Sequence, residues 1–484
     1  MLDKAAKKET QAPATSEWRI GTIQPSISLY LLAALVGLIA GFLAFILKTA
    51  IKWISTFLVG HFHPDDVNFG LLIFPVVGIL LAVAFQKWII GRSLEHGTEK
   101  IKASLIAKQY DLPFSDTYGP MIASTFTLGF GGSAGAEGPI ATAGAAIASI
   151  LGQRLRLPEQ LLRILVACGA GAGIAGIFKA PIGGVMFTLE VIGIELSTVP
   201  IIALVIACVV GGMTSYGCTG FTLDVPLTHA QHFDPAMSGW VALLGIFCGL
   251  YSIYYSSFAA YTRRAYSNIS SPWARAVISG AMLAILVFTF PALYGEGYNV
   301  MAELIDGNTQ ALTSGSLICH GGSTSPTMII LFCGGMAIVK AFATISTNSG
   351  GGVAGDFAPT LFAGCMTGYV FGAALNSIFG LSLPAENFAL IGMAGTMAGI
   401  IHAPLMAMFI VVETTGYYGM MFPVVLATIF SYATVTYLRP NKNRAYAQEL
   451  RRVFRNFVVQ IHAVNERNRH KKYRKRLPRP HRKR

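Results

Sequence analysis

Charged residues are scarce in this sequence: Asp, Glu, Lys and Arg make up only 12% of 484 residues, against ~25% in typical soluble proteins. Hydrophobic residues make up 53%, and the mean hydropathy is +0.57. A soluble protein of this length needs more charge on its surface. The composition therefore excludes an ordinary soluble protein and places most of the chain in a membrane.

Motifs of catalysis and metal binding are also missing. The seven cysteines are scattered and never form C-x-x-C, so we interpret them as small buried apolar residues. The chain contains no H-E-x-x-H, no G-x-S-x-G and no paired catalytic aspartates. The His-containing segments at 61–66 and 228–232 are interpreted as solvated loops. We therefore expect no enzyme activity, no cofactor and no bound metal.

The positive charge is confined to one end of the chain. The formal net charge is 36 − 23 = +13, but Arg439–Arg484 holds 17 of the Lys and Arg and two of the acids, which gives +15 there and −2 elsewhere. On a membrane protein, such a tail indicates attraction to anionic lipid headgroups rather than to nucleic acid. The first 20 residues lack the apolar core of a signal peptide and are interpreted as a cytoplasmic leader.

Apolar stretches recur along the chain and predict roughly ten to twelve membrane segments. Several are divided by Gly and Pro into pieces too short to span alone, which is typical of helices broken inside the membrane. Basic residues gather at Lys87–Lys108 and in the tail, so the positive-inside rule places both in the cytoplasm. Two crossings separate the leader from this loop, so both termini are expected inside.

An internal repeat is the most informative feature. Gly131–Pro139 (GGSAGAEGP) matches Gly351–Pro359 (GGVAGDFAP) at five of nine positions, at an offset of 220 residues. Gly169–Gly193 matches Gly392–Gly416 at eight of 25 positions, at an offset of 223 residues. Two matches in the same order at nearly the same offset indicate a duplicated transporter or channel, with its site where the broken helices meet.

The GGSAGAEGP segment has the properties of an anion site made of backbone. Glycines allow a close approach of the main chain, and a helix that starts at Pro139 would direct its unpaired amide N–H groups and its positive dipole end at an anion. The copy before Pro359 would supply a second such end. The alternative is that both segments are glycine motifs for helix packing.

Glu137 lies within this segment. A carboxylate among small apolar residues at membrane depth is costly and typical of function. Because it is itself an anion, Glu137 can occupy the same amides as a transported anion and leave them when it is protonated, which would make it a gate. The alternative is that it only stabilises the helix dipole.

Three other acidic residues are open to two interpretations each. Glu190 and Glu413 occupy equivalent positions in the repeat, and they are either proton relays or residues hydrogen-bonded to neighbouring backbone. Asp356 would repel an anion, so its side chain either points away and caps a turn or belongs to a cation site.

These motifs resemble those of the chloride channel (CLC) family of anion channels and proton-coupled anion exchangers. G-x-x-G-x-E-G-P is matched by Gly132–Pro139, A-P-x-x-G-x-x-F-x-x-E by Ala180–Glu190, and G-x-F-x-P by Gly355–Pro359. The resemblance spans residues 30–450. It implies an all-α polytopic membrane protein, a homodimer with about eighteen helices per subunit, two inverted repeats with broken helices, and one pore in each subunit.

The resemblance also implies roles for single residues. Glu137 looks like the external gating glutamate. The family closes the central anion site from the cytoplasmic side with a serine, where this chain has His96, and with a tyrosine hydroxyl, which Tyr446 fits. The implied binding groups for chloride or a similar anion are the amides of Ala136, Glu137 and Gly138 at an outer site, the amides of Asp356 and Phe357 at a central site, and the side chains of His96 and Tyr446.

Three departures from the family's pattern bear on function. His96 in place of serine changes the group that sets anion preference, because a histidine can donate an N–H to the anion. Val191 stands where the antiporters carry an internal proton glutamate, which favours a channel. Ala136 replaces a common basic residue beside Glu137. The chain also has no room for the paired cytoplasmic regulatory domains of many eukaryotic members, which favours a prokaryotic protein.

The sequence thus predicts four regions: a cytoplasmic leader at 1–27, a first membrane repeat at 28–225, a second at 226–445, and a basic cytoplasmic tail at 446–484. The predicted function is transport of chloride or a similar small inorganic anion across the inner or plasma membrane, gated by protonation of Glu137. A proton-coupled anion antiporter is the alternative, and a cation or acidic-solute carrier is the weaker one.

Overall fold

The computed structural model describes residues 25–60, 68–94, 97–194, 198–225, 233–313, 316 and 325–439. These residues are almost entirely helical. They contain no β-strand, only one isolated antiparallel bridge. The predicted all-α architecture is confirmed.

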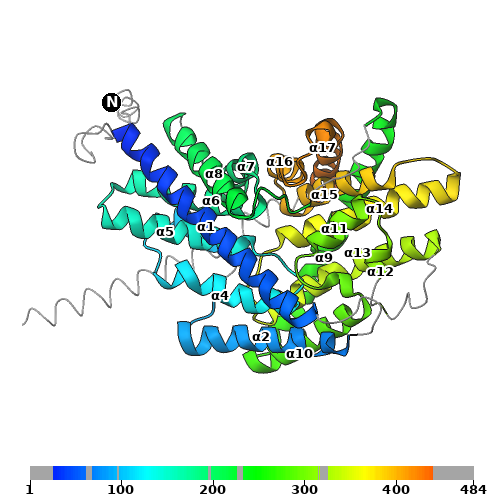
Figure 1. Ribbon diagram of the computed structural model, residues 1–484, viewed down its shortest axis with the longest axis horizontal. Coiled ribbons are helices and arrows are strands. Elements are labelled where there is room, and N and C mark those ends of the chain that lie inside the picture. Colours follow the sequence, from blue (N-terminus) through cyan, green and yellow to red (C-terminus); the bar gives the residue numbers. More distant parts are fainter. Residues whose placement is uncertain are drawn as a thin grey trace, which may run out of the picture.

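The two halves of the chain form two groups of helices. Figure 1 shows α1, α5, α6 and α8 on the left of the view and α13, α14 and α15 on the right. The first group comprises α1 (Pro25–Val59), α2 (Phe74–Phe85), α3 (Gly97–Ile106), α4 (Ser115–Gly129), α5 (Glu137–Arg154), α6 (Glu159–Phe178), α7 (Pro181–Met186) and α8 (Thr198–Cys218). The second comprises α9 (Ser238–Ser267), α10 (Pro272–Thr289), α11 (Tyr298–Ile305), α12 (Gln310–Thr313), α13 (Pro326–Ser349), α14 (Phe357–Phe379), α15 (Ala385–Ile401), α16 (Pro404–Thr415) and α17 (Met421–Leu438).

Eight helices in the described part are long and apolar enough to cross a membrane, and four further apolar helices are shorter. The chain is therefore a multi-pass membrane protein. The long apolar run of the sequence at Leu161–Ile194 is divided into α6, α7 and a short π-helical turn at Phe187–Ile192. Gly and Pro thus break this segment as predicted.

The backbone repeats in the two halves as the sequence does. Gly131 and Gly351 both have a positive φ, of 99° and 105°. Lys179 and His402, which end α6 and α15, are both non-glycine residues in the left-handed region, with φ of 54° and 61°. Residues other than glycine rarely adopt this backbone conformation. Its recurrence at the repeat offset indicates that the two segments are copies of one structure.

The same helix crossing occurs once in each repeat. In the first, α5 packs on α6 where Gly144 faces Gly169, and in the second α14 packs on α15 where Gly364 faces Gly392. A methyl group on any of these four glycines would overlap the carbonyl of the facing glycine. Close packing at small residues is how membrane helices associate without a hydrophobic driving force. These crossings hold the start of α5 and of α14 in place.

Candidate functional site

The two repeats meet directly before α5 and α14. The amide of Gly135 donates to the carbonyl of Gly355 at 3.0 Å, and the two residues form an antiparallel bridge. Gly135 and Gly355 are equivalent residues, 220 apart. An antiparallel pair of equivalent residues implies a local two-fold rotation between the copies, which agrees with the predicted inverted repeats. The bridge brings the N-termini of the two helices together.

Both helices begin earlier than the sequence predicted. Helix α5 begins at Glu137 and α14 at Phe357, two residues before Pro139 and Pro359. Each proline therefore lies in the first turn rather than at the first helical position. Proline is tolerated there because the first N–H groups of a helix have no partner within it.

Glu137 connects the N-terminus of α5, where it lies, to the N-terminus of α14. Its side chain is buried, with a relative exposure of 1%, and its Oε1 accepts hydrogen bonds from the amides of Phe357 and Ala358, the latter at 2.9 Å. The carboxylate from the first repeat thus occupies the first amides of α14 in the second. These amides lie one residue further along the chain than the predicted pair of Asp356 and Phe357.

The other predicted amides lie around the same point. Ala136 directly precedes α5, is fully buried, and donates its amide N–H to Oε1 of Glu296 at 3.1 Å. Gly138 is buried in the first turn of α5, where its carbonyl faces Gly97 at the start of α3. The site therefore contains two carboxylates, only one of which the sequence pointed to.

The side chain of Asp356 is bonded to a neighbouring side chain. Its Oδ1 accepts a hydrogen bond from Nδ2 of Asn348 at 2.8 Å, near the end of α13. The contact is local, but Asp356, which directly precedes α14, makes no capping hydrogen bond with its side chain, so the predicted cap is not seen.

Glu190 and Glu413 make the same contact in opposite directions. Glu413 accepts hydrogen bonds from the amides of Ile182 and Gly183 at 3.0 and 2.8 Å, at the start of α7. In the copy, Glu190 accepts from the amides of Leu405 and Met406 at 3.1 and 2.8 Å, at the start of α16. Of the two interpretations, both residues are hydrogen-bonded to backbone, and each binds the helix N-terminus of the other repeat.

Val191 follows Glu190 in the π-helical turn that extends α7 and is partly buried. Its side chain cannot hold or release a proton. The neighbouring Glu190 is engaged with α16.

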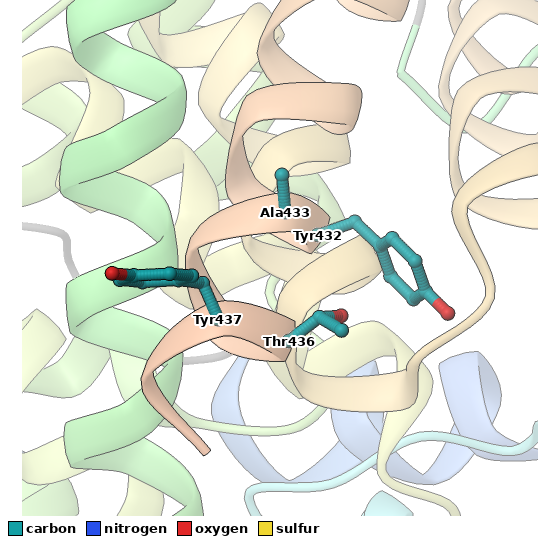
Figure 2. A pocket seen from close by; sticks show the side chains of 4 residues that line it. All are labelled: Tyr432, Ala433, Thr436 and Tyr437. Carbon is teal, nitrogen blue, oxygen red and sulfur yellow. The ribbon is translucent and has the colours of Figure 1, made fainter. Parts of the chain in front are cut away.

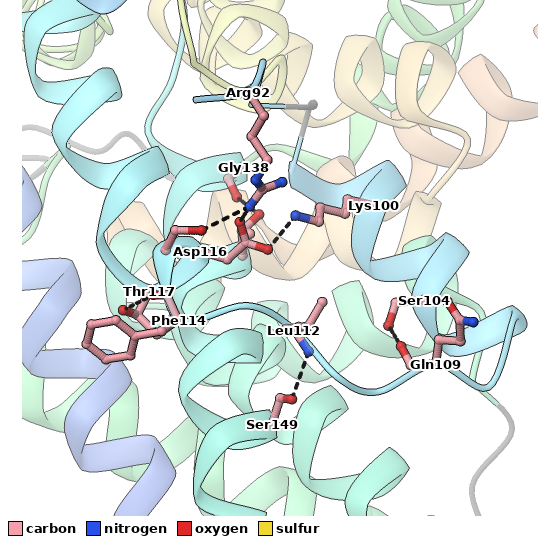
Figure 3. A network of polar contacts seen from close by, with 12 residues as sticks. Arg92, Lys100, Ser104, Gln109, Leu112, Phe114, Asp116, Thr117, Gly138 and Ser149 are labelled. Carbon is pink, nitrogen blue, oxygen red and sulfur yellow. Dashed lines mark hydrogen bonds and ion pairs between the residues drawn. The ribbon is translucent and has the colours of Figure 1, made fainter. Parts of the chain in front are cut away.

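His96 and Tyr446 lie outside the described residues, as do the histidine segments at 61–66 and 228–232. The flanks of the His96 loop are nevertheless fixed. Arg92 before it and Lys100 after it both form ion pairs with the buried carboxylate of Asp116 (Figure 3). Gly97 lies against the carbonyl of Gly138. The structure therefore brings the end of this loop to the first turn of α5.

Comparison with known proteins identifies the family. Residues 77–436 match the family described as voltage gated chloride channel. The chain belongs to this family.

Relatives of known name support the same family. The chain is 27% identical over 382 residues to the voltage-gated ClC-type chloride channel ClcB of Citrobacter koseri, across 74% of this chain and 84% of that protein. It is 26% identical over 429 residues to the H(+)/Cl(−) exchange transporter ClcA of Vibrio vulnificus, across 83% and 85%. The solved structure of a slow cyanobacterial Cl−/H+ antiporter shares the fold, with a TM-score of 0.71 at 21% identity over 85% of this chain and 94% of that one.

Membership of the chloride channel family does not by itself distinguish a channel from an exchanger. Relatives of nearly equal identity carry either name. The distinction therefore depends on the residues of this chain.

Two charged residues of the site, Glu296 and Lys340, were not predicted from the sequence. Lys340 is fully buried on α13, and its Nζ donates to Oγ of Ser133 at 2.8 Å, in the loop before α5. An ionisable residue within the apolar segment Met328–Ile345 was a signal that could have revealed it. Glu296 lies in the loop between α10 and α11, where no local pattern marks it.

A surface depression at the end of α17 lies apart from these residues. It is lined by Tyr432, Ala433, Thr436 and Tyr437 (Figure 2). None of these residues is charged. We assign it no part in anion binding.

Proposed function

We propose that this protein transports chloride or a similar small anion across the membrane through one path in each subunit of a homodimer, and that protonation of Glu137 opens the path. The function is transport, without catalysis and without a cofactor. The proposal includes an inner or plasma membrane location, with both termini in the cytoplasm.

One observation carries this proposal: the Glu137 carboxylate accepts hydrogen bonds from the amides of Phe357 and Ala358. An anion that leaves water needs N–H donors in place of its hydration shell, and the start of a helix offers unpaired ones with a favourable dipole. A carboxylate and a transported anion carry the same charge and use the same donors. They therefore exclude one another.

Protonation changes the outcome of this competition. A charge-assisted hydrogen bond is about twice as strong as a neutral one, so a protonated Glu137 holds the amides less firmly and an anion displaces it. Flux should therefore rise as the pH falls. On the alkaline side of the titration, the protonated fraction changes about tenfold per pH unit.

The remaining groups of the proposed site follow from the family resemblance. The amides of Ala136, Glu137 and Gly138 form the outer site, and the amides of Asp356 and Phe357 contribute to the central one. His96 and Tyr446 close the central site from the cytoplasmic side.

Two features favour a channel over an exchanger. Val191 offers no group to carry a proton from the cytoplasm. Glu190 beside it is bound to the start of α16, so a relay through it would break a contact between the repeats. The alternative is a proton-coupled anion antiporter in which the proton reaches Glu137 by another route. Uphill proton movement driven by an anion gradient would establish this alternative.

The test is flux from liposomes with simultaneous anion and proton readouts, for the unchanged protein and for Glu137→Gln. Glutamine resembles the protonated side chain and cannot titrate. We expect anion-selective flux that rises at low pH in the unchanged protein, and flux with most of its pH dependence removed in Glu137→Gln.

Glu303→Gln is the matched control, because Glu303 is exposed on α11. It should keep the pH dependence of the unchanged protein. A pH dependence retained in Glu137→Gln would refute the gating role. A reversal potential of the opposite sign in a salt gradient would indicate the cation or acidic-solute carrier instead.

A further inference from the structure

A second carboxylate occupies the other helix start of the site. Oε1 of Glu296 accepts the amide N–H of Ala136, the residue directly before α5, at 3.1 Å. Glu137 occupies the first amides of α14 in the same way. Both helix starts that build the proposed anion path are therefore bound to a carboxylate of the protein itself.

The carboxylates of Glu137 and Glu296 differ in their exposure to solvent. Glu137 is buried, whereas Glu296 keeps part of its surface exposed. They are close enough to interact electrostatically. Glu296 is therefore the more accessible of the two carboxylates.

Charged groups from three other elements surround Glu296. Its carboxylate interacts favourably with Lys48 of α1 and Lys340 of α13, and unfavourably with Asp224, in the loop after α8. Lys48 also forms an ion pair with Asp224 at 2.7 Å. The buried ammonium of Lys340 lies 4.4 Å from the centre of the Phe362 ring. Positive charge is thus present near Glu296, although Ala136 itself carries none.

We propose that Glu296 is a second gating carboxylate, which holds the amide of Ala136 until a transported anion displaces it. This inference rests on the proposed function. The physical reason is the same competition: a bound anion needs the N–H donor that Glu296 uses. The nearby lysines stabilise the carboxylate after it is displaced, because they interact with it by charge rather than by a single hydrogen bond.

The competing explanation is that Glu296 only balances the charge of Lys48 and Lys340. The two explanations differ in what they require of the side chain. Competition requires a carboxylate that reaches the amide of Ala136. Charge balance requires only a negative charge in the neighbourhood. Aspartate is one methylene shorter than glutamate, so it keeps the negative charge but is too short to accept the hydrogen bond from the amide of Ala136.

The experiment is chloride binding to the purified full-length protein, measured by isothermal titration calorimetry for the unchanged chain, Glu296→Gln and Glu296→Asp. If Glu296 competes for the amide, both variants should bind chloride about tenfold more tightly, the effect of removing one competing charge-assisted hydrogen bond. If it only balances charge, Glu296→Gln should differ from the unchanged chain and Glu296→Asp should not, which would overturn the proposal.

The exposed Glu303 provides the matched control, since Glu303→Gln removes a carboxylate from the neighbouring helix without touching Ala136. It should bind chloride as the unchanged chain does. Unaltered affinity in both Glu296 variants would also overturn the inference, and so would loss of the fold in both, because the contact would then be structural. Absence of chloride binding in the unchanged chain and the control would instead refute the proposed function.

Discussion

Carboxylates bind helix N-termini across the repeat boundary in two regions of this protein, but only one of these arrangements is symmetric. Glu413 binds the start of α7 and Glu190 binds the start of α16, so the contact is made twice, once in each direction. Glu137 binds the start of α14. Its equivalent in the second repeat is Phe357, so the residue before α5 is bound instead by Glu296, which is not the counterpart of Glu137.

The difference suggests how a duplicated protein separates structure from function. A reciprocal contact holds the two repeats together in the manner of an isologous interface. Glu137 and Glu296 are not equivalent residues, so symmetry does not couple their contacts, and each can open by itself. The symmetric pair is therefore expected to govern stability, and Glu137 to govern flux.

The largest effect on flux is expected from a substitution that fills the space now occupied by the Glu137 side chain. A methyl group at Gly355 would lie 2.8 Å from Cδ of Glu137, which is too close for two carbon atoms. Gly355→Ala should therefore displace the carboxylate from the amides of α14 while its charge is kept. We expect flux that is high at neutral pH, with most of the pH dependence lost, in the liposome assay.

Gly334→Ala is the control, because nothing lies within 4 Å of an added methyl group there. It should leave the pH dependence of flux unchanged. Normal gating in Gly355→Ala would mean that the carboxylate does not need its present position to close the path.

A second effect is expected on stability rather than on flux. Glu413 is 7% exposed and accepts two backbone hydrogen bonds, and Glu413→Ala leaves both amides at the start of α7 without a partner. We expect a loss of about 3 kcal/mol, since bonds to charged groups contribute about 1.5–3 kcal/mol each. Thermal melting in detergent would show it. The pH dependence of the surviving flux should stay normal, and a flattened profile would contradict the division of roles.

The smallest effect is expected at Glu190, the other half of the symmetric pair. Glu190 is only partly buried, whereas Glu413 is buried, and the outer donor to each, Leu405 or Ile182, is exposed to a similar extent. Water can therefore replace part of the lost contact. Glu190→Ala should destabilise the protein by about 1 kcal/mol, measured by the same melting assay. A larger loss than in Glu413→Ala would show that burial does not set the strength of these contacts.

Much of the fold and the centre of the site could be predicted from the sequence. Glycine spacing, the A-P pairs and the placement of glutamates recur at fixed offsets, because a duplicated backbone needs the same special residues twice. Glu137 was found because a carboxylate in an apolar segment is costly. The division of the chain into regions at 27, 225 and 445 stays a prediction, as do the roles of His96 and Tyr446.

The start of each helix and the partners of each carboxylate could not be predicted. Both prolines suggested a first helical position, yet each helix begins two residues earlier, shortly after the bridge between Gly135 and Gly355. Glu296 lies 160 residues from Ala136. No local pattern connects positions so far apart.

The sequence by itself determined that this is a duplicated membrane protein of the chloride channel family, with little charge in its body and a glutamate among helix-starting glycines. Composition and repetition are properties of the chain, and they need no coordinates. Only the tertiary structure decided which amide each carboxylate binds. Hydrogen bonds depend on distances of about 3 Å between atoms, and such distances between the two repeats are set by how the helices pack.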